Sequence, residues 1–272
     1  MIMYDKGLPS LPDDIIYEIF TLLDTRALKS CSLTGKALSH STKPFLHRIL
    51  SLTPRYWGPA KSNIPGYWNE LEGLPTLGER GLLKYTRHIL VFLPYCTLLS
   101  AHMLQPHIRH LHALTNLRSL EVRWLDAPSF MPRMEKYFGA FLESLESLEL
   151  VFPRGDHKQI LFFICQFRNL RDLTINTVQG YSHSRHDGGP HFDIELSPPL
   201  DGILDLRLDA DTGPEIDLMS AQSILCSLAT LSSGLKFRTL KLSKPRHGLQ
   251  VLVDACAPTL ECMEFTGVWA GV

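Results

Sequence analysis

The sequence has almost no net charge and no long apolar run. Its 272 residues include 27 Lys and Arg against 28 Asp and Glu. This balance gives no overall field that would attract nucleic acid or an anionic membrane surface, so we expect neither as a partner. The longest apolar stretch, at 89–99, is interrupted by Pro94. It is well short of the ~20 residues that a membrane-spanning helix needs.

Secretion signals and cysteine frameworks are also missing. The first ten residues, MIMYDKGLPS, contain Asp5 and no apolar core of signal-peptide length. The six cysteines form no CxxC pair, which favours reduced thiols that are buried as small apolar side chains. We therefore expect an intracellular protein, cytoplasmic or nuclear.

No motif of a common enzyme is present. The sequence contains no GxSxG, no Gly-rich phosphate loop and no HExxH. Three histidines in QPHIRHLHAL do not share one helix face, and HSRHDGGPH is typical of an exposed loop. DADTG, at 209–213, lacks the remaining acids of a calcium loop. We expect a non-catalytic protein that needs no cofactor and no metal.

The first fifty residues predict three short helices. Pro12, followed by Asp13 and Asp14, is a favourable helix start, and further helices are expected from Thr25 and from Thr34, the last ending before Pro44. The first helix carries an apolar arc wider than the about 100° stripe that a surface helix buries. Its members are Ile15, Ile16, Ile19, Phe20, Leu22 and Leu23. A bundle this small cannot cover that arc alone, so either the following domain or a partner must cover it.

The segment LPDDIIYEIFTLLDTRALKSCSLTGKAL resembles an F-box, the helical module that docks its owner onto a ubiquitin ligase. The matching residues are Leu11, Pro12, Asp14, Ile15, Ile16, Ile19, Phe20, Leu23, Asp24, Leu28, Ser32, Leu33 and Lys36. Gly35 and Leu38 depart from the pattern, which often has Cys and Trp there, and Gly35 is expected to weaken the third helix. The resemblance implies a Skp adaptor as partner, and through it a cullin–RING scaffold. The residues it implies for adaptor binding are Leu11, Pro12, Ile15, Ile16, Ile19 and Leu28.

From residue 85 an apolar-x-x-apolar-x-apolar unit recurs. Its central residues, spaced by 23 to 34 positions, are Ile89, Leu120, Leu148, Leu173, Leu206, Leu240 and Met263. This period is typical of a leucine-rich solenoid with one strand per unit. Helix-like stretches at 134–145, 158–167, 218–231 and 249–257 alternate with the strands and favour parallel pairing. The Asn expected after each unit is missing, so the repeats should be irregular; an ordinary α/β domain remains the alternative.

These patterns predict an α/β chain in three parts. A three-helix F-box occupies 8–50, an irregular connection 51–84, and an irregular leucine-rich-repeat-like solenoid of parallel strands and helices 85–272. In this organisation the chain resembles a large group of fungal F-box proteins with degenerate leucine-rich repeats.

The resemblance implies a substrate receptor of an SCF-type ubiquitin ligase, whose repeats bind a target protein. Alternation along the strands predicts a candidate target-binding face made of Glu121, Arg123, Glu149, Thr174, Asn176, Arg207, Asp209, Lys241, Ser243, Glu264 and Thr266. The competing hypothesis is a repeat-based interaction protein, outside any ligase, whose F-box-like helices only cap the solenoid.

Overall fold

The computed structural model describes residues 11–53, 68–70, 73–92, 107–123, 136, 138–151, 153, 157–177, 198–208, 228–229, 235–243 and 249–265. The HSRHDGGPH and DADTG segments, and most of the helix expected at 218–231, lie outside these residues.

Three helices form the N-terminal module: α1 (Asp13–Leu22), α2 (Thr25–Thr34) and α3 (Lys36–Leu46). As predicted, α1 begins directly after Pro12 with two acidic residues in its first turn. The Asp24 carboxylate accepts a hydrogen bond of 2.7 Å from the Ala27 amide and so caps α2. The prediction that the third helix ends before Pro44 is wrong. Pro44 lies in the last turn, where its fixed φ suits the helix and only one hydrogen bond is lost.

The described strands form one nine-stranded sheet in which every pair is parallel. Its order is β2-β1-β3-β4-β5-β6-β7-β8-β9, so from β3 onwards each strand pairs with the next in the sequence. The strands are β1 (Ile49–Thr53), β2 (Trp68–Glu70), β3 (His88–Phe92), β4 (Ser119–Arg123), β5 (Ser147–Val151), β6 (Asp172–Thr177), β7 (Ile203–Leu208), β8 (Thr239–Ser243) and β9 (Cys262–Phe265). This order confirms an α/β fold with a parallel, solenoid-like sheet.

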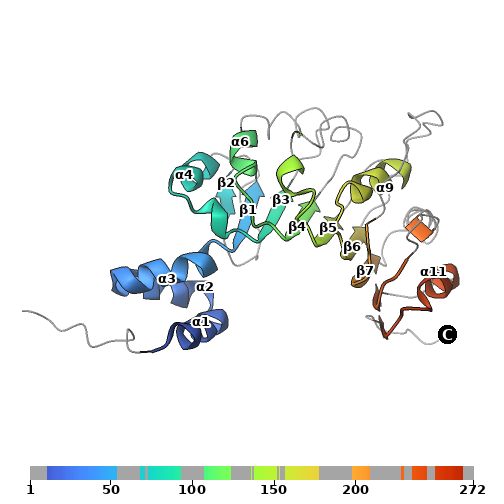
Figure 1. Ribbon diagram of the computed structural model, residues 1–272, viewed down its shortest axis with the longest axis horizontal. Helices are drawn as coiled ribbons and strands as arrows, with labels where there is room; N and C mark the ends of the chain where they lie inside the picture. The colour runs from blue at the N-terminus through green and yellow to red at the C-terminus, as the bar shows by residue number, and fades with distance from the viewer. Residues whose placement is uncertain are drawn as a thin grey trace, which may run out of the picture.

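Helices follow one side of this sheet along its length (Figure 1). They are α4 (Leu74–Glu79), α6 (Ile108–Leu111), α9 (His157–Cys165) and α11 (Leu249–Cys256). Two rows of side chains from the sheet form the core that they cover. One row is Leu50, Ile89, Leu120, Leu148, Leu173, Leu204 and Leu240, and the other is Leu52, Val91, Val122, Leu150, Ile175, Leu206 and Leu242. The module α1–α3 lies at the end where the sheet begins (Figure 1).

The sheet begins earlier than the sequence predicted. β1 starts at Ile49, and the stretch 51–84, expected to be irregular, contributes β2, α4 and the 3₁₀ turn η3 (Leu83–Tyr85). The first unit has His47 at the position where four later units have Leu117, Leu145, Leu170 and Leu260, so it does not match the repeat pattern. The His47 carbonyl oxygen accepts a hydrogen bond of 3.1 Å from the Thr86 hydroxyl, which joins this unit to the next.

The predicted register of β7 is also corrected. Leu204 pairs with Leu173 and Leu206 with Ile175, so the buried positions lie two residues earlier than expected. In the segment ILDLRL, either Leu204 and Leu206 or Leu206 and Leu208 could be the two buried positions. Only the pairing with β6 selects the first of these registers.

Side chains outside the expected Asn position join successive repeats. The Asn116 amide donates to the Lys84 carbonyl oxygen at 2.7 Å, and the Asn169 amide donates to the Glu143 carbonyl oxygen at 2.6 Å. The Ser144 hydroxyl donates to the Leu117 carbonyl oxygen at 3.0 Å. These bonds satisfy turn carbonyls that a regular leucine-rich repeat would satisfy with its own Asn.

Candidate functional site

One side of α1 carries an exposed apolar stripe. Ile15, Ile19 and Leu22 stand at i, i+4 and i+7, which places them on one helix face over two turns. Ile15 is 44% exposed and Leu22 is 85% exposed, while Ile19 is half-buried. Leu11, just before the helix, is 37% exposed. This stripe has the spacing with which an amphipathic helix binds an apolar groove.

The opposite side of α1 packs against α3. Phe20 is buried, and its ring meets the Phe45 ring edge-on at a centroid distance of 5.5 Å. Tyr17 lies 4.9 Å from Phe45. The wide apolar arc is therefore divided, because the edge around Phe20 closes the three-helix core and the edge around Ile15 faces outward.

The six residues implied for adaptor binding differ in exposure. Leu11, Pro12 and Ile15 are exposed, and Ile16 and Ile19 are half-buried. Leu28 is only 5% exposed, so it stabilises the packing of α2 and offers little surface.

Two exposed leucines were missed as candidate residues, Leu22 on α1 and Leu33 on α2, the latter 87% exposed. The spacing of Leu22 from Ile15 would have found the first of these.

Gly35 does not weaken α3 as expected. It lies between α2 and α3 in an extended conformation, outside both helices, and a Cβ there would meet nothing within 4 Å. The departure from the F-box pattern at this position therefore costs no helix stability.

The second candidate surface is the sheet face opposite the helices. Its first row, in register across the sheet, is Leu90, Glu121, Glu149, Thr174, Asp205, Lys241 and Glu264. Its second row includes Arg123, Val151, Asn176, Arg207 and Ser243. The shift of β7 adds Asp205, which sequence reasoning missed. Asp209 and Thr266 lie outside the described residues.

Charges on this face are paired with one another. Arg123 Nε lies 2.6 Å from Glu121 Oε1, and Arg207 bridges Asp205 at 2.8 Å and Glu149 at 3.6 Å. Farther along, Lys241 Nζ lies 3.1 Å from Glu264. Towards β9 the pairs are more exposed, whereas Glu121 is only 7% exposed. The more accessible part of this face thus presents both signs of charge in fixed positions.

Burial shifts the pKa values of two groups on this face, Glu149 and His88. It raises the pKa of Glu149, and the nearby carboxylate of Glu121 raises it further. It lowers the pKa of His88 despite the opposing effect of Glu121, whose Oε2 lies 3.9 Å from His88 Nε2. His88 is therefore biased towards the neutral form, and its Nδ1 shares a hydrogen bond of 2.9 Å with the Ser119 hydroxyl.

Among the described residues, no group of three or more His, Cys, Asp or Glu side chains is placed to hold a metal ion. In the same part of the chain, no helix is long and apolar enough to cross a membrane. Cys165 and Cys256 are buried, and burial raises their thiol pKa values to about 12 and about 11. Both thiols therefore serve as core side chains.

No family model matches the chain. No curated protein matches it significantly.

Proposed function

We propose that this protein is a non-catalytic substrate receptor of an SCF-type ubiquitin ligase. In this function α1 and α2 dock on a Skp adaptor, and the sheet face opposite the helices holds a target protein. The ubiquitin-transferring chemistry belongs to other subunits, and the receptor contributes by bringing the target close to them. The F-box resemblance of residues 11–38 motivates the choice of partner.

The observation that carries the proposal is the exposed stripe of Ile15, Ile19 and Leu22. A free helix gains nothing from three apolar side chains in water at i, i+4 and i+7, whereas a partner groove can bury all three. Full burial of one such side chain is worth about 1.5–3 kcal/mol. Since Leu22 is already 85% exposed, nearly all of that gain is available on binding.

The target-binding part of the proposal is supported by the paired charges near β7, β8 and β9. Asp205, Arg207 and Lys241 project from adjacent strands at fixed register. Such a row is the kind of surface on which repeat proteins bind other proteins.

Adaptor binding can be tested with the full chain and a purified Skp adaptor in isothermal titration calorimetry. Ile15→Asp and Leu22→Asp place a charge on the exposed stripe and should each weaken binding at least tenfold. Thr21→Asp adds the same charge at an exposed residue of α1 that lies about 100° or more around the helix from each residue of the stripe, so it is the matched control and should bind like the wild type. Circular dichroism checks that all three variants keep the wild-type fold. A folded wild type that does not bind the adaptor would refute the proposal.

The alternative is a solenoid cap with no place in a ligase. It is favoured by the short link of α3 to the sheet, since α3 ends at Leu46 and β1 begins at Ile49. In that case the adaptor would not bind.

A further inference from the structure

The residues that directly precede the strands stack on one another at the end of the sheet where the strands begin. We call this row the edge ladder and each of its residues a rung. The Arg87 amide donates to the Arg48 carbonyl oxygen at 2.9 Å, and the Arg118 amide donates to the Arg87 carbonyl oxygen at 2.8 Å. The same pattern continues through the later repeats. In order, the rungs are Arg48, Arg87, Arg118, Glu146, Arg171, Gly202, Arg238 and Glu261. Adjacent rungs are held about 4.8 Å apart by strand pairing.

The later arginines of this ladder have acidic partners. Arg118 pairs with Glu146 at 2.8 Å, Arg171 with Asp201 at 2.7 Å, and Arg238 with Glu261 at 3.7 Å. These pairs bring opposite charges together on neighbouring repeats, which stabilises the ladder.

The first two arginines differ. Within the part of the chain that the structure describes, Arg48 and Arg87 pair with no acidic side chain, although they stand on adjacent rungs and next to Arg118. Like charges on neighbouring strands repel one another. All three arginines have exposed side chains, so they are accessible to an anion from solution.

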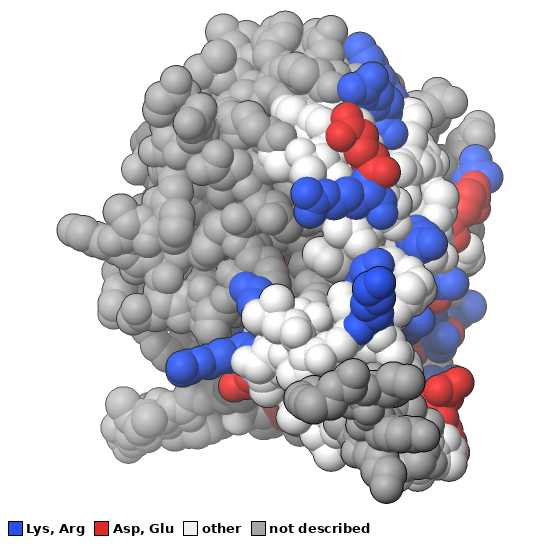
Figure 2. All heavy atoms as spheres, turned by 90° about the vertical axis from the view of Figure 1, so that its left-hand side faces the viewer, with Lys and Arg blue, Asp and Glu red and all other residues white. Residues whose placement is uncertain are grey.

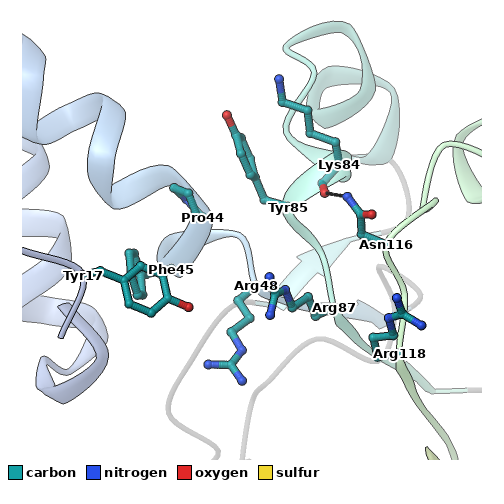
Figure 3. A pocket seen from close by; sticks show the side chains of 9 residues that line it. All are labelled: Tyr17, Pro44, Phe45, Arg48, Lys84, Tyr85, Arg87, Asn116 and Arg118. Carbon is teal, nitrogen blue, oxygen red and sulfur yellow. Dashed lines mark hydrogen bonds between the residues drawn. The ribbon is translucent and has the colours of Figure 1, made fainter. Parts of the chain in front are cut away.

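These three arginines line a pocket of about 340 Å³ between the N-terminal module and the sheet. Tyr17 and Phe45 form its wall on the side of α1 and α3, and Lys84 and Tyr85 stand on the opposite side (Figure 3). No carboxylate is among the described residues that line it, although Glu146 lies 2.8 Å from Arg118. Lys and Arg also dominate the middle of the described surface at this end of the molecule, although some Asp and Glu occur there (Figure 2).

Hydrogen bonds and ring contacts hold the backbone and the aromatic side chains around the pocket in place. The Asn116 amide donates to the Lys84 carbonyl oxygen and ties η3 to the next repeat, while Lys84 Nζ lies 5.1 Å from the centre of the Tyr85 ring. Phe45 is held between Tyr17 and Phe20. The three guanidinium groups come from backbone positions locked by the sheet.

We propose that this pocket binds a small anion that carries at least two phosphate groups. Guanidinium groups bind phosphate oxygens through paired hydrogen bonds. Lys84 adds a further positive charge beside Arg48 and Arg87, while Arg118 shares its guanidinium with Glu146. The backbones of Arg48 and Arg118 stand about 10 Å apart, two strand spacings, so an anion with two phosphate groups can contact arginines of separate repeats. The pocket volume lies at the lower end of the range for small-molecule sites, and the near-zero net charge of the chain argues against a nucleic acid.

The site is independent of the adaptor stripe, so the two proposals can fail separately. The test uses the full chain in isothermal titration calorimetry at 150 mM NaCl. Tripolyphosphate and inositol hexakisphosphate represent free and organic sources of the same chemistry, and a singly phosphorylated serine peptide represents a macromolecular source. Sulfate measures simple anion binding.

The key variants are Arg48→Gln and Arg87→Gln, which remove one guanidinium each and keep a polar side chain. The matched control is Arg238→Gln, which removes an exposed arginine from the same ladder far from the pocket. Each pocket variant should weaken tripolyphosphate or inositol hexakisphosphate binding about 10- to 100-fold, because hydrogen bonds between charged groups are lost. The control should bind like the wild type.

Thermal unfolding provides a second readout. The polyanion should raise the melting temperature of the wild type and of Arg238→Gln, and this rise should disappear in the pocket variants. Without ligand, the pocket variants should be as stable as the wild type, because they lose no ion pair to any residue that the structure describes.

Saturable binding of one polyphosphate per chain with this variant pattern supports the proposal. Binding no tighter than sulfate, equal loss in Arg238→Gln, or binding of the phosphopeptide alone would overturn it.

Discussion

Replacing Gly202 by alanine tests how closely β6 and β7 approach each other. Gly202 is the rung of the edge ladder before β7, and a Cβ there would overlap Asp172 Oδ1. That oxygen accepts a hydrogen bond of 2.7 Å from the Ile203 amide. The Cβ would also lie 3.3 Å from the Arg171 carbonyl oxygen, which belongs to the backbone and cannot move freely. The alanine side chain must therefore displace the Asp172 carboxylate and break its hydrogen bond.

The size of the effect follows from two opposing terms. Loss of a hydrogen bond to a charged group costs about 1.5–3 kcal/mol. Reduced freedom of the unfolded chain returns about 0.4–1 kcal/mol when Gly becomes Ala. We expect Gly202→Ala to lower the free energy of unfolding by about 0.5–2.5 kcal/mol. Gly73→Ala is the matched control, since a Cβ there meets nothing within 4 Å.

Equilibrium urea unfolding of the full chain measures this difference, and hydrogen exchange at the Ile203 amide reports the broken bond directly. A double-mutant cycle identifies the cause. In an Asp172→Ala background the hydrogen bond is already absent, so Gly202→Ala should then cost little or slightly stabilise. If Gly202→Ala is as stable as the wild type, or costs the same in both backgrounds, the clash with Asp172 is not the reason for this glycine.

Two substitutions and one labelling experiment test the interior and the contacts between repeats. Burial raises the pKa of Glu149, so the folded state keeps its proton at pH values where the unfolded chain has lost it. Ionisation then costs stability, and Glu149→Gln should be more stable than the wild type at neutral pH. That advantage should shrink as the pH falls through the raised pKa, as urea unfolding over a pH series would show. Asn169→Ala removes the hydrogen bond to the Glu143 carbonyl oxygen and should cost about 0.5–1.5 kcal/mol, measured as a shift of the urea midpoint. Burial, which raises the pKa of Cys165 to about 12, should keep this thiol unmodified by iodoacetamide until the chain unfolds, as peptide mass spectrometry can follow.

Local signals were sufficient to predict much of the fold. A proline followed by two acidic residues predicted the start of α1, and apolar spacing predicted the strands from β3 onwards, because both depend on residues close together in the chain. Where two local frames were equally apolar, as in ILDLRL, the sequence could not choose between them. Pairing with β6 decided that register, and with it the place of Asp205 in the row that contains Thr174 and Lys241.

For the candidate adaptor-binding site, too, the sequence predicted one part and the packing of the folded chain decided the other. The apolar arc of α1 follows from the sequence, because helical periodicity alone places Ile15, Ile19 and Leu22 on one face. Which edge of that arc is buried depends on Phe45, which lies on another helix. The exposure of Leu22 could therefore be found only in the folded chain.

The sequence by itself determined an α/β chain with an amphipathic first helix and a repeating strand unit, since these properties depend on local spacing. Only the tertiary structure brought Arg48, Arg87 and Arg118 together. They lie 31 to 70 residues apart in the sequence and become neighbours because parallel pairing stacks the start of each repeat on the last. Charge balance over the whole chain concealed this local excess of positive charge, which exists only once the strands are paired.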